Sequence, residues 1–230
     1  MLDFGYYNMD CMQGMKEFPD KYFDLAIVDP PYGGVSLGGY ASNKVSGGVA
    51  RNRNDYILDL WVQSAPDDKY FDELFRVSKN QIIWGGNYFI EQIHRNSQCW
   101  LVWDKKKPEG VTYADVELAW TSFDKGAKIF HYAWNGMIQG DMKNKEHKIH
   151  PTQKPTKLYK WILSQFANKG DKILDTHVGS ASSLIACKEM GFDYVGFELS
   201  EAYYELSRER LERNRAQMTI SDLLDDWRFP

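Results

Sequence analysis

The sequence has little that would suit a disulfide-stabilised, secreted or membrane-spanning protein. Its three cysteines, Cys11, Cys99 and Cys187, are isolated and form neither a CxxC metal pattern nor a disulfide framework, which is typical of a reducing cytosol. No apolar run approaches the roughly 18 residues of a membrane span. The first ten residues lack a basic segment followed by an apolar one, so we expect no signal peptide. We therefore expect a cytoplasmic protein without a membrane partner.

An excess of positive charge is also missing. The 28 Lys and Arg residues face 32 Asp and Glu residues, which gives a net charge of −4. This balance argues against a protein that coats nucleic acid indiscriminately, but it is compatible with a local basic cleft. With 230 residues, of which 43 % are hydrophobic, the chain is long enough for one large α/β domain or two small ones. Strand and helix patterns alternate along it, which favours an α/β fold with a largely parallel sheet.

The second half of the chain contains a strand–turn–helix–strand unit with an acid at the end of each strand. Asp175 ends the run "DKILD", and Glu198 ends the next strand 23 residues later. In such units the second acid accepts hydrogen bonds from ribose hydroxyls. The turn between them has one glycine, Gly179, where dinucleotide fingerprints have three. This favours a ligand with a ribose and no pyrophosphate, such as S-adenosylmethionine, although a purely structural unit with two incidental acids fits the spacing equally well.

A second unit joins the buried strand "DLAIV" (24–28) directly to the stiff turn "DPPY". Asp29 offers a carboxylate and Pro30 a carbonyl, and these two acceptors suit the two N–H groups of an exocyclic amino group on a base. Pro30 and Pro31 fix the backbone, so the acceptors are preorganised. Tyr32 offers a face on which a base flipped out of the helix can stack. The turn predicts methyl transfer from a sulfonium to an amino nitrogen, without a metal or a covalent intermediate; the alternative for the bare motif is an ordinary turn.

Three motifs in this order resemble the β-class amino-group DNA methyltransferases, which make N6-methyladenine or N4-methylcytosine. The motifs are "VDPPYG", "HPTQKP" (150–155) and "ILDTHVGSASS … YVGFELS". The segments "SKNQIIWGGNYF" and "WLVWDK" look like those of small phage-type adenine methyltransferases, and the resemblance covers roughly residues 6–213. It implies one domain over residues 1–230 with a Rossmann-like methyltransferase fold. The expected sheet is mostly parallel and seven-stranded, with one antiparallel strand and a circularly permuted order in which the catalytic motif precedes the cofactor motif.

The resemblance also implies roles for individual residues. The catalytic set is Asp29, Pro30, Pro31 and Tyr32. The cofactor is S-adenosylmethionine, which leaves as S-adenosylhomocysteine, and no metal is expected. The residues expected to bind this cofactor are Asp10, Asp29, Thr152, Lys154, Pro155, Asp175, His177, Gly179, Ser180 and Glu198.

Three positions of the cofactor turn depart from the family's usual pattern. The family commonly has a proline at Thr176, an aromatic residue at His177 and a glycine at Ala181. His177 fits two interpretations, a stacking or donating residue next to the cofactor and a histidine in the pocket wall. These departures bear on the detail of cofactor contact and leave the acid pair in place.

Double-stranded DNA is the expected partner, and three basic segments are candidates to bind it, at residues 33–54, 143–160 and 104–107. A mobile loop is expected at about residues 33–54, because that stretch is rich in Gly, Ser and Asn and contains no acid from Gly33 to Asn54. A short target-recognition region is expected within about residues 105–149. The candidate phosphate contacts are Lys44, Arg51, Arg53, Lys143, Lys145 and Lys148.

The leading hypothesis is adenine-N6 methylation of DNA by a solitary, restriction-associated or phage-borne enzyme of a bacterial, archaeal or phage-infected cell. Asp29 at the head of the motif favours adenine, since the cytosine-N4 enzymes more often have serine there. Cytosine N4, an RNA or protein amide nitrogen, and a catalytically degenerate domain that only binds DNA stay open as alternatives. A nucleotide-dependent oxidoreductase is disfavoured by the missing GxGxxG. Family members are often dimers, which makes a homodimer a further expectation.

Overall fold

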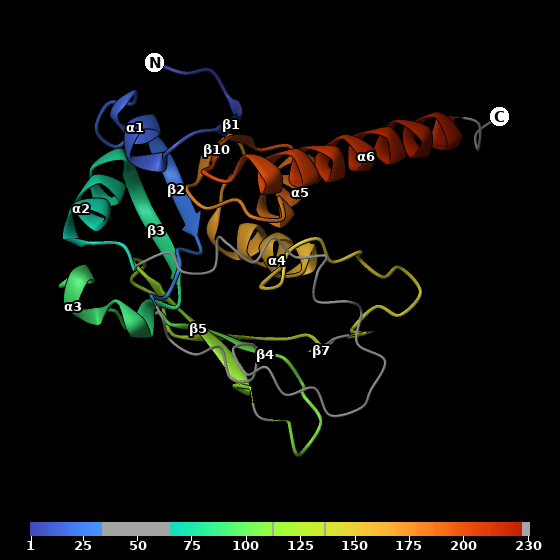
Figure 1. Cartoon of the computed structure of the whole chain (residues 1–230), viewed down its shortest axis with the longest axis horizontal. Coiled ribbons are helices and arrows are strands. Elements are labelled where there is room, and N and C mark those ends of the chain that lie inside the picture. Colours follow the sequence, from blue (N-terminus) through green and yellow to red (C-terminus); the bar gives the residue numbers. More distant parts are fainter. Residues whose placement is uncertain (34–64, 112, 136, 227–230) are drawn as a thin grey trace.

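The computed structural model describes residues 1–33, 65–111, 113–135 and 137–226, with side chains up to Asn214. Its centre is a sheet of eight strands in the order β1-β10-β9-β2-β3-β5-β4-β6 (Figure 1). These strands are β1 (Gly5–Asn8), β2 (Phe23–Val28), β3 (Ser78–Trp84), β4 (Leu101–Asp104), β5 (Val116–Thr121), β6 (Lys128–His131), β9 (Lys172–Asp175) and β10 (Asp193–Glu198). A separate hairpin is formed by β7 (Trp134–Asn135) and β8 (Ile138–Gln139).

The predicted α/β fold with a mostly parallel sheet is confirmed. Only β5 runs antiparallel to its neighbours β3 and β4, while the other pairings in the eight-stranded sheet are parallel. The expected number of seven strands is one too low for the described part of the chain. The additional strand is β6, which pairs only with β4 at the sheet edge. Its four residues "KIFH" are half-buried or exposed, so the sequence there lacks the continuous apolar run of a central strand.

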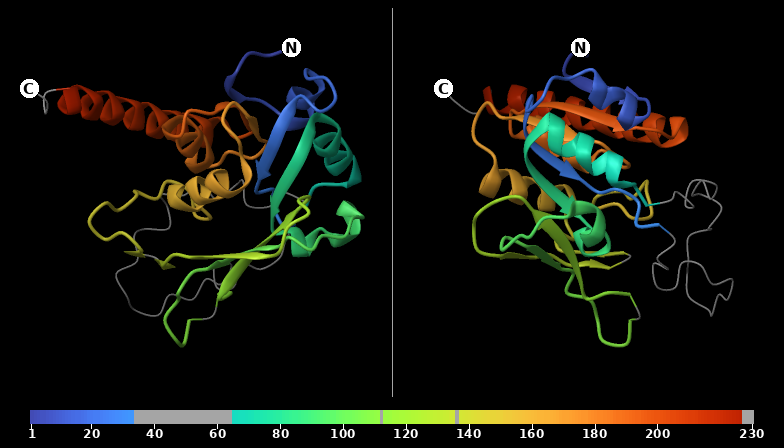
Figure 2. Two further views of the ribbon diagram at one scale, coloured as in Figure 1. Left: turned by 180° about the vertical axis from the view of Figure 1, so that it is seen from behind. Right: turned by 90° about the vertical axis from the view of Figure 1, so that its left-hand side faces the viewer.

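Helices cover both faces of the sheet in a three-layer arrangement (Figure 2). One layer contains α1 (Cys11–Lys16), α2 (Asp68–Val77), η3 (Gly86–Tyr88) and α3 (Ile90–Ile93). The other layer contains α4 (Thr156–Phe166), α5 (Ser182–Glu189) and α6 (Glu201–Asp226). Within the described residues, no helix is long and apolar enough to span a bilayer.

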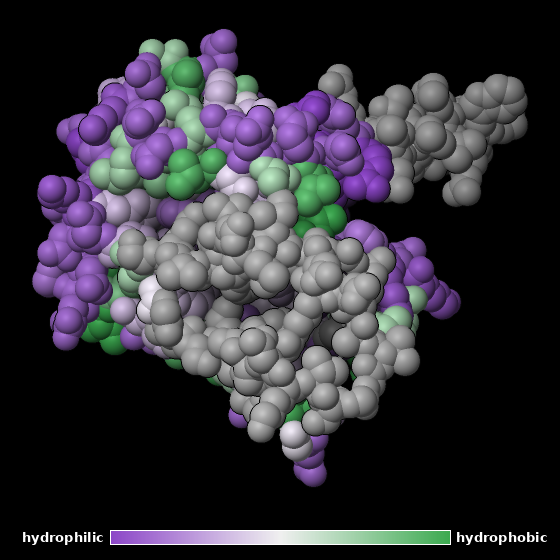
Figure 3. All heavy atoms as spheres, in the orientation of Figure 1, coloured by the Kyte–Doolittle hydropathy of each residue, from purple (hydrophilic) through white to green (hydrophobic). Residues whose placement is uncertain are grey.

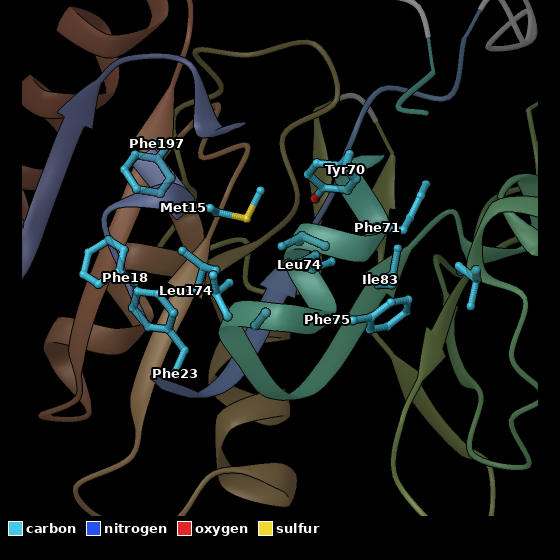
Figure 4. Close-up of a cluster of buried hydrophobic side chains, with 14 of the residues drawn as sticks. Met15, Phe18, Phe23, Tyr70, Phe71, Leu74, Phe75, Ile83, Leu174 and Phe197 are labelled. Atoms are coloured by element: carbon cyan, nitrogen blue, oxygen red, sulfur yellow. The ribbon is translucent and has the colours of Figure 1, made fainter. Parts of the chain in front are cut away.

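The strand β2 shows why its sequence is apolar without interruption. Ala26 and Val28 belong to the buried cluster under α1 and α2, part of which is drawn in Figure 4. Leu25 and Ile27 belong to the opposite cluster under α4 and α5. A parallel strand that is covered on both faces has no side exposed to water, so every position favours an apolar side chain.

Local signals in the sequence set the helix ends. Asp67 caps α2, with its carboxylate accepting from the Tyr70 N–H at 3.2 Å. Ser200 caps α6 through its hydroxyl, which accepts from the Tyr203 N–H at 3.3 Å, as Ser at an N-cap does in general. The backbone of α6 then continues to Asp226 and extends beyond the body of the molecule (Figure 1).

The exposed surface over α1 and α2 is mostly hydrophilic, with separate apolar spots (Figure 3).

Candidate functional site

Four acids follow the carboxyl ends of neighbouring parallel strands. Asp10 lies just beyond β1, Glu198 ends β10, Asp175 ends β9 and Asp29 directly follows β2. Because these strands are parallel and adjacent in the order β1-β10-β9-β2, the four acids lie along one edge of the sheet. The chain leaves β9 towards β10 and leaves β2 towards β3, which lie on opposite sides. This is a topological switch point, where open α/β sheets bind their ligands.

In the predicted catalytic turn, the carboxylate of Asp29 is held by Tyr32 of the same turn and by Lys154 from a distant part of the chain. The Tyr32 hydroxyl donates to Oδ1 of Asp29 at 2.7 Å, and the ammonium of Lys154 binds Oδ2. Pro30 is buried and Pro31 half-buried. The Asp29 side chain retains 19 % exposure, so its carboxylate is held on two sides and is still reachable.

The aromatic ring of Tyr32 lies on the turn that follows β3. It stacks on Tyr88 with a centroid distance of 5.0 Å and meets Phe89 edge-on at 5.9 Å. A Cβ atom at Gly85 would approach the Tyr32 ring to 2.2 Å, and Gly85 has a φ of +67°. Glycine is therefore required here for both space and conformation. The sequence does not single out Tyr88 as a neighbour of Tyr32, since an aromatic residue after a Gly-Gly turn also suits a core position.

The motif "HPTQKP" brings a buried lysine to the predicted catalytic turn. The Lys154 side chain is only 3 % exposed, and its ammonium lies 3.2 Å from Oε2 of Glu117 in addition to its contact with Asp29. It also lies 5.4 Å from the centre of a Trp84 ring. Burial lowers the pKa of Lys154, but the two carboxylates outweigh burial and raise it above its ordinary value. The predicted cofactor role of Lys154 stays a prediction.

Glu117 is a site residue that the sequence did not reveal. It lies on β5 and pairs with Lys105 at 2.5 Å as well as with Lys154. Burial raises the pKa of Glu117, but the two ammonium groups outweigh it and lower the pKa below its usual value. The stretch "DVELAW" gives no signal for this role, because an acid within a strand usually marks a solvent-exposed position.

Asp175 is a buried carboxylate at the centre of the edge. It accepts hydrogen bonds from the hydroxyl of Ser183 and, at 3.0 Å, from the backbone N–H of His177. Among the described residues, no cation forms an ion pair with it. Burial raises the pKa of Asp175 to about 7, against the opposing effect of its hydrogen bonds. A cationic ligand is the natural partner for such a group.

Glu198 organises the small-residue turn. Its two carboxylate oxygens accept from the backbone N–H groups of Gly179 at 2.8 Å and Ser200 at 2.9 Å. Burial raises the pKa of Glu198 above its ordinary value, against these hydrogen bonds. A carboxylate has about four acceptor positions, so both oxygens keep capacity for hydroxyl groups of a ligand. Gly179 has a φ of +54°, which explains why glycine is retained in this turn.

The departures from the family pattern at Thr176 and His177 interact with each other. The Tyr70 hydroxyl lies 2.7 Å from the Thr176 hydroxyl, which lies 2.9 Å from Nδ1 of His177. The Tyr70 and His177 rings also meet edge-on at 5.4 Å. Burial lowers the pKa of His177 to about 4, so the ring is neutral at physiological pH. Ala181 adopts the left-handed conformation with a φ of +60°, which explains why the family commonly has glycine there.

The other predicted cofactor residues differ in their exposure. Asp10 caps α1 by accepting from two backbone N–H groups at 2.7 and 3.2 Å. Thr152 is exposed, and its hydroxyl lies 3.0 Å from Nδ1 of His150. Pro155 is buried at the start of α4, and Ser180 is buried next to Gly179. Their roles in cofactor binding stay predictions.

The DNA-binding candidates fall into two groups. Lys44, Arg51 and Arg53, together with most of the expected mobile loop, lie outside the described residues. Lys143 and Lys145 are exposed, as a phosphate contact requires. The ammonium of Lys148 lies 4.5 Å from the centre of a Trp134 ring, and burial lowers its pKa to about 8, so it is the least accessible of the three.

Comparison with known proteins gives consistent matches. The family model for N6/N4 DNA methylases matches residues 67–209. The type II methyltransferase M.HpaI of Haemophilus parainfluenzae is 39 % identical over 241 residues, which cover 88 % of this chain and 72 % of the relative. The crystal structure of the M1.HpyAVI–SAM complex has a TM-score of 0.55 at 20 % identity and covers 89 % of this chain and 98 % of that one. PvuII DNA methyltransferase, which is cytosine-N4-specific, has a TM-score of 0.60 at 11 % identity and covers 94 % and 91 %. At these identities the solved structures support the fold alone.

Proposed function

Because this chain belongs to the N6/N4 DNA methylase family, we propose that it methylates the N6 amino group of adenine in double-stranded DNA with S-adenosylmethionine as the donor. The observation that supports this most directly is the placement of Asp29 and Asp175 on adjacent strands at the switch point of the sheet. One acid carries the stiff turn suited to an amino group, and the other is a buried carboxylate suited to a cation.

The residues around β9 and β10 fit the donor chemically. The donor carries a sulfonium and an ammonium, and Asp175 is buried without an ion-pair partner among the described residues. Ribose hydroxyls require acceptors, and Glu198 keeps acceptor capacity on both oxygens. Gly179 and Ser180 keep the turn small, which allows a ligand to approach the backbone. Asp175 and Glu198 would hold the donor, with Asp10 at the neighbouring strand end.

In the transfer step the methyl carbon leaves sulfur with the C–S electron pair remaining on sulfur, a C–N bond forms to the amino nitrogen, and one amino proton is released. The amino nitrogen is a poor nucleophile, since its lone pair is delocalised into the ring. Acceptors on both N–H groups favour a pyramidal nitrogen and expose the lone pair. Asp29 and the Pro30 carbonyl supply these acceptors, and the Asp29 carboxylate also stabilises the positive charge that develops on nitrogen.

The contacts of Asp29 leave room for this role. Tyr32 and Lys154 each occupy one acceptor position on different oxygens, while a carboxylate offers about four. Tyr32 is fixed by its hydrogen bond and by Tyr88, so its ring and the carboxylate are held in one arrangement. Holding both groups still lowers the reorganisation needed in the transfer step.

Cytosine N4 is the second candidate acceptor. Cytosine presents an amino group next to a ring nitrogen, as adenine does, and one structural neighbour is a cytosine-N4-specific enzyme. Asp29 at the head of the motif favours adenine over cytosine. A domain that binds DNA without turnover is disfavoured by the presence of both Asp29 and Tyr32.

The test is methylation of duplex DNA by the purified full-length protein with labelled S-adenosylmethionine, followed by nucleoside analysis. We expect N6-methyladenine. N4-methylcytosine alone would refute the adenine assignment, and unlabelled DNA would favour the binding-only alternative. Sequencing with modified-base detection of DNA from cells that express the gene would give the recognition site in the same experiment.

Two variants test the division of the site. Asp29→Ala should abolish turnover and keep donor affinity within about tenfold, since Asp29 acts on the amino group. Glu198→Ala should raise the donor dissociation constant about 10- to 100-fold, since a hydrogen bond to a charged group contributes about 1.5–3 kcal/mol. Asp193→Ala, an exposed position at the start of β10, is the matched control. Loss of donor binding in Asp29→Ala would mean that this acid belongs to the donor half.

A further inference from the structure

One buried ammonium is shared by two carboxylates beside the catalytic turn. Lys154 contacts Oδ2 of Asp29 and lies 3.2 Å from Oε2 of Glu117. Asp29 follows β2, Glu117 lies on β5, and Lys154 precedes α4, so three separate parts of the chain meet here. Lys105 closes the array on the other oxygen of Glu117 at 2.5 Å.

Because Lys154 is buried, the sharing of its ammonium between two carboxylates affects how tightly it binds each of them. An ammonium has three donor positions, and this side chain is only 3 % exposed. Among the described residues, its charged contacts are the two carboxylates, and it also lies 5.4 Å from the centre of a Trp84 ring. A change at Glu117 cannot be compensated by bulk water at Lys154, and it must alter how strongly the ammonium binds Asp29.

We propose that Glu117 is a positioning residue for the methylation, which acts through Lys154 to keep Asp29 available as an acceptor for the amino group. The proposal rests on the proposed function, because it assigns a role within the same site. Glu117 does not need to touch the base. It draws part of the hydrogen bonding and charge of Lys154 to itself, so that Asp29 is anchored without being neutralised.

The charge balance explains the effect on the reaction. Asp29, Lys154 and Glu117 together carry a net charge of −1, whereas Asp29 and Lys154 alone are neutral. The amino nitrogen becomes positive during transfer, and a net negative site stabilises that charge more strongly. Lys105 brings the formal charge of the four groups to zero, but its ammonium lies on Oε1 of Glu117, the oxygen that does not contact Lys154. The hydroxyl of Tyr159 on α4 also faces this region: burial and the nearby carboxylates of Asp29, Asp175 and Glu117 raise its pKa, so it stays neutral.

The test compares Glu117→Gln with Lys154→Met in the full-length protein. Under single-turnover conditions we expect Glu117→Gln to slow methyl transfer by about tenfold or more, with donor affinity unchanged. With the donor kept at saturation, losing a like charge near Asp29 should move the acidic limb of the pH–rate profile to lower pH. Lys154→Met removes the cation between the acids and should move the same limb to higher pH. A purely structural role would not give opposite shifts.

Two further variants control for general damage. Glu117→Asp keeps the charge and should recover most of the rate and the wild-type pH profile. Glu109→Gln removes an exposed acid between β4 and β5 and should change neither. Thermal unfolding and donor binding show whether Glu117→Gln is folded. If it is not, Lys105→Met carries the comparison: it leaves Glu117 to Lys154 alone and should raise the pKa of Lys154, and an unchanged Lys154 titration in that variant would overturn the coupling.

A measurement without DNA separates this proposal from the proposed function. In protein labelled with carbon-13 at the lysine Cε positions, the pKa of Lys154 should fall in Glu117→Gln, because one of the two carboxylates that raise it is lost. If the wild type methylates no DNA, the proposed function fails while this titration still tests the shared ammonium. Three results would each overturn the role of Glu117. The first is a wild-type rate and pH–rate profile in Glu117→Gln, and the second is an unchanged titration of Lys154 in that variant. The third is a loss of rate that is fully explained by a loss of donor affinity.

Discussion

Replacing Asp175 by asparagine should make the ligand-free protein more stable above neutral pH. The pKa of Asp175 in the folded chain is raised from 3.8 to about 7, with burial as the largest cause. Above pH 7 the folded protein must therefore hold a buried carboxylate whose charge has no ion-pair partner among the described residues. Asparagine has a similar size and can still accept from the His177 N–H, but it carries no charge.

The size of this stabilisation follows from the difference between the folded and unfolded pKa values of Asp175. A difference of about 3 pKa units at 1.36 kcal/mol per unit gives an upper limit of about 4 kcal/mol. The amide fits the hydrogen bonds of Ser183 and His177 less well than a carboxyl group, at a cost of about 1–2 kcal/mol. We therefore expect Asp175→Asn to raise the free energy of unfolding by about 2 kcal/mol at pH 8. For a chain of this size that corresponds to about 4–8 °C in Tm.

The stability gained by Asp175→Asn should depend on pH. A folded-state pKa above the unfolded value means that the folded chain binds more protons between pH 4 and 7, so the contribution of Asp175 to stability is present below about pH 4 and is lost as the pH rises through 7. The stability difference between variant and wild type should grow over this window and be constant above it. Urea unfolding at pH 5, 6, 7 and 8 measures it, with Asp193→Asn as the exposed control.

The same substitution should weaken donor binding, because the carboxylate that we propose pairs with the cationic donor is lost. Calorimetric titration at pH 8 with S-adenosylmethionine checks this. In the wild type, donor affinity should fall as the pH drops below about 7 and Asp175 becomes protonated. A stability difference that is the same at pH 5 and pH 8 would refute the buried, unpaired charge, whatever the effect on binding.

Three further predictions concern the frame of the site. Gly85→Ala places a Cβ 2.2 Å from the Tyr32 ring at a φ of +67°, so methyl transfer should fall at least about tenfold in rapid-quench assays with donor affinity kept; full activity would show that Tyr32 moves freely. Ala181→Gly removes the strain of an alanine in the left-handed conformation, which stabilises the fold by about 1 kcal/mol. It also removes a buried methyl group, which destabilises the fold by about 0.8 kcal/mol. Its free energy of unfolding in urea should stay within about 1 kcal/mol of the wild type, and a larger change would contradict this balance. Arg210→Met leaves Glu146 without its 2.6 Å partner and should destabilise by about 3 kcal/mol in thermal unfolding. Adding Glu146→Gln to Arg210→Met should recover part of the lost stability. If the effects of the two substitutions on stability simply add, the two residues are not coupled.

Features that depend on neighbouring residues could be predicted from the sequence. Short apolar runs predict the strand before Asp29 and the strands that end at Asp175 and Glu198, and the structure confirms all three. Strands in a parallel sheet end at one edge, so acids at their ends lie close together once the sheet is parallel. The same reasoning could not find β6, since its short sequence carries no such pattern.

The contacts of Lys154 and Glu117 depend on distant parts of the chain. Lys154 and Asp29 are 125 residues apart, and no local pattern in "VELAW" marks Glu117 as its second partner. The hydrogen bonds that join Tyr70 to Thr176 likewise connect α2 to the turn after β9 across 106 residues. The sequence showed Thr176 and His177 as departures from the family, and the structure supplies the interactions that accommodate them.

The sequence by itself determined the α/β fold, the stiff Asp-Pro-Pro-Tyr turn and the acids at the strand ends, because each depends on the conformational preferences and burial of consecutive residues. Only the tertiary structure decided how these groups are charged and paired. A pKa or an ion pair depends on which chain segments pack together and exclude water, and that is set by the assembled sheet and its two helical layers. The place of Asp29 at the end of a buried strand was predictable, whereas its shared lysine was not.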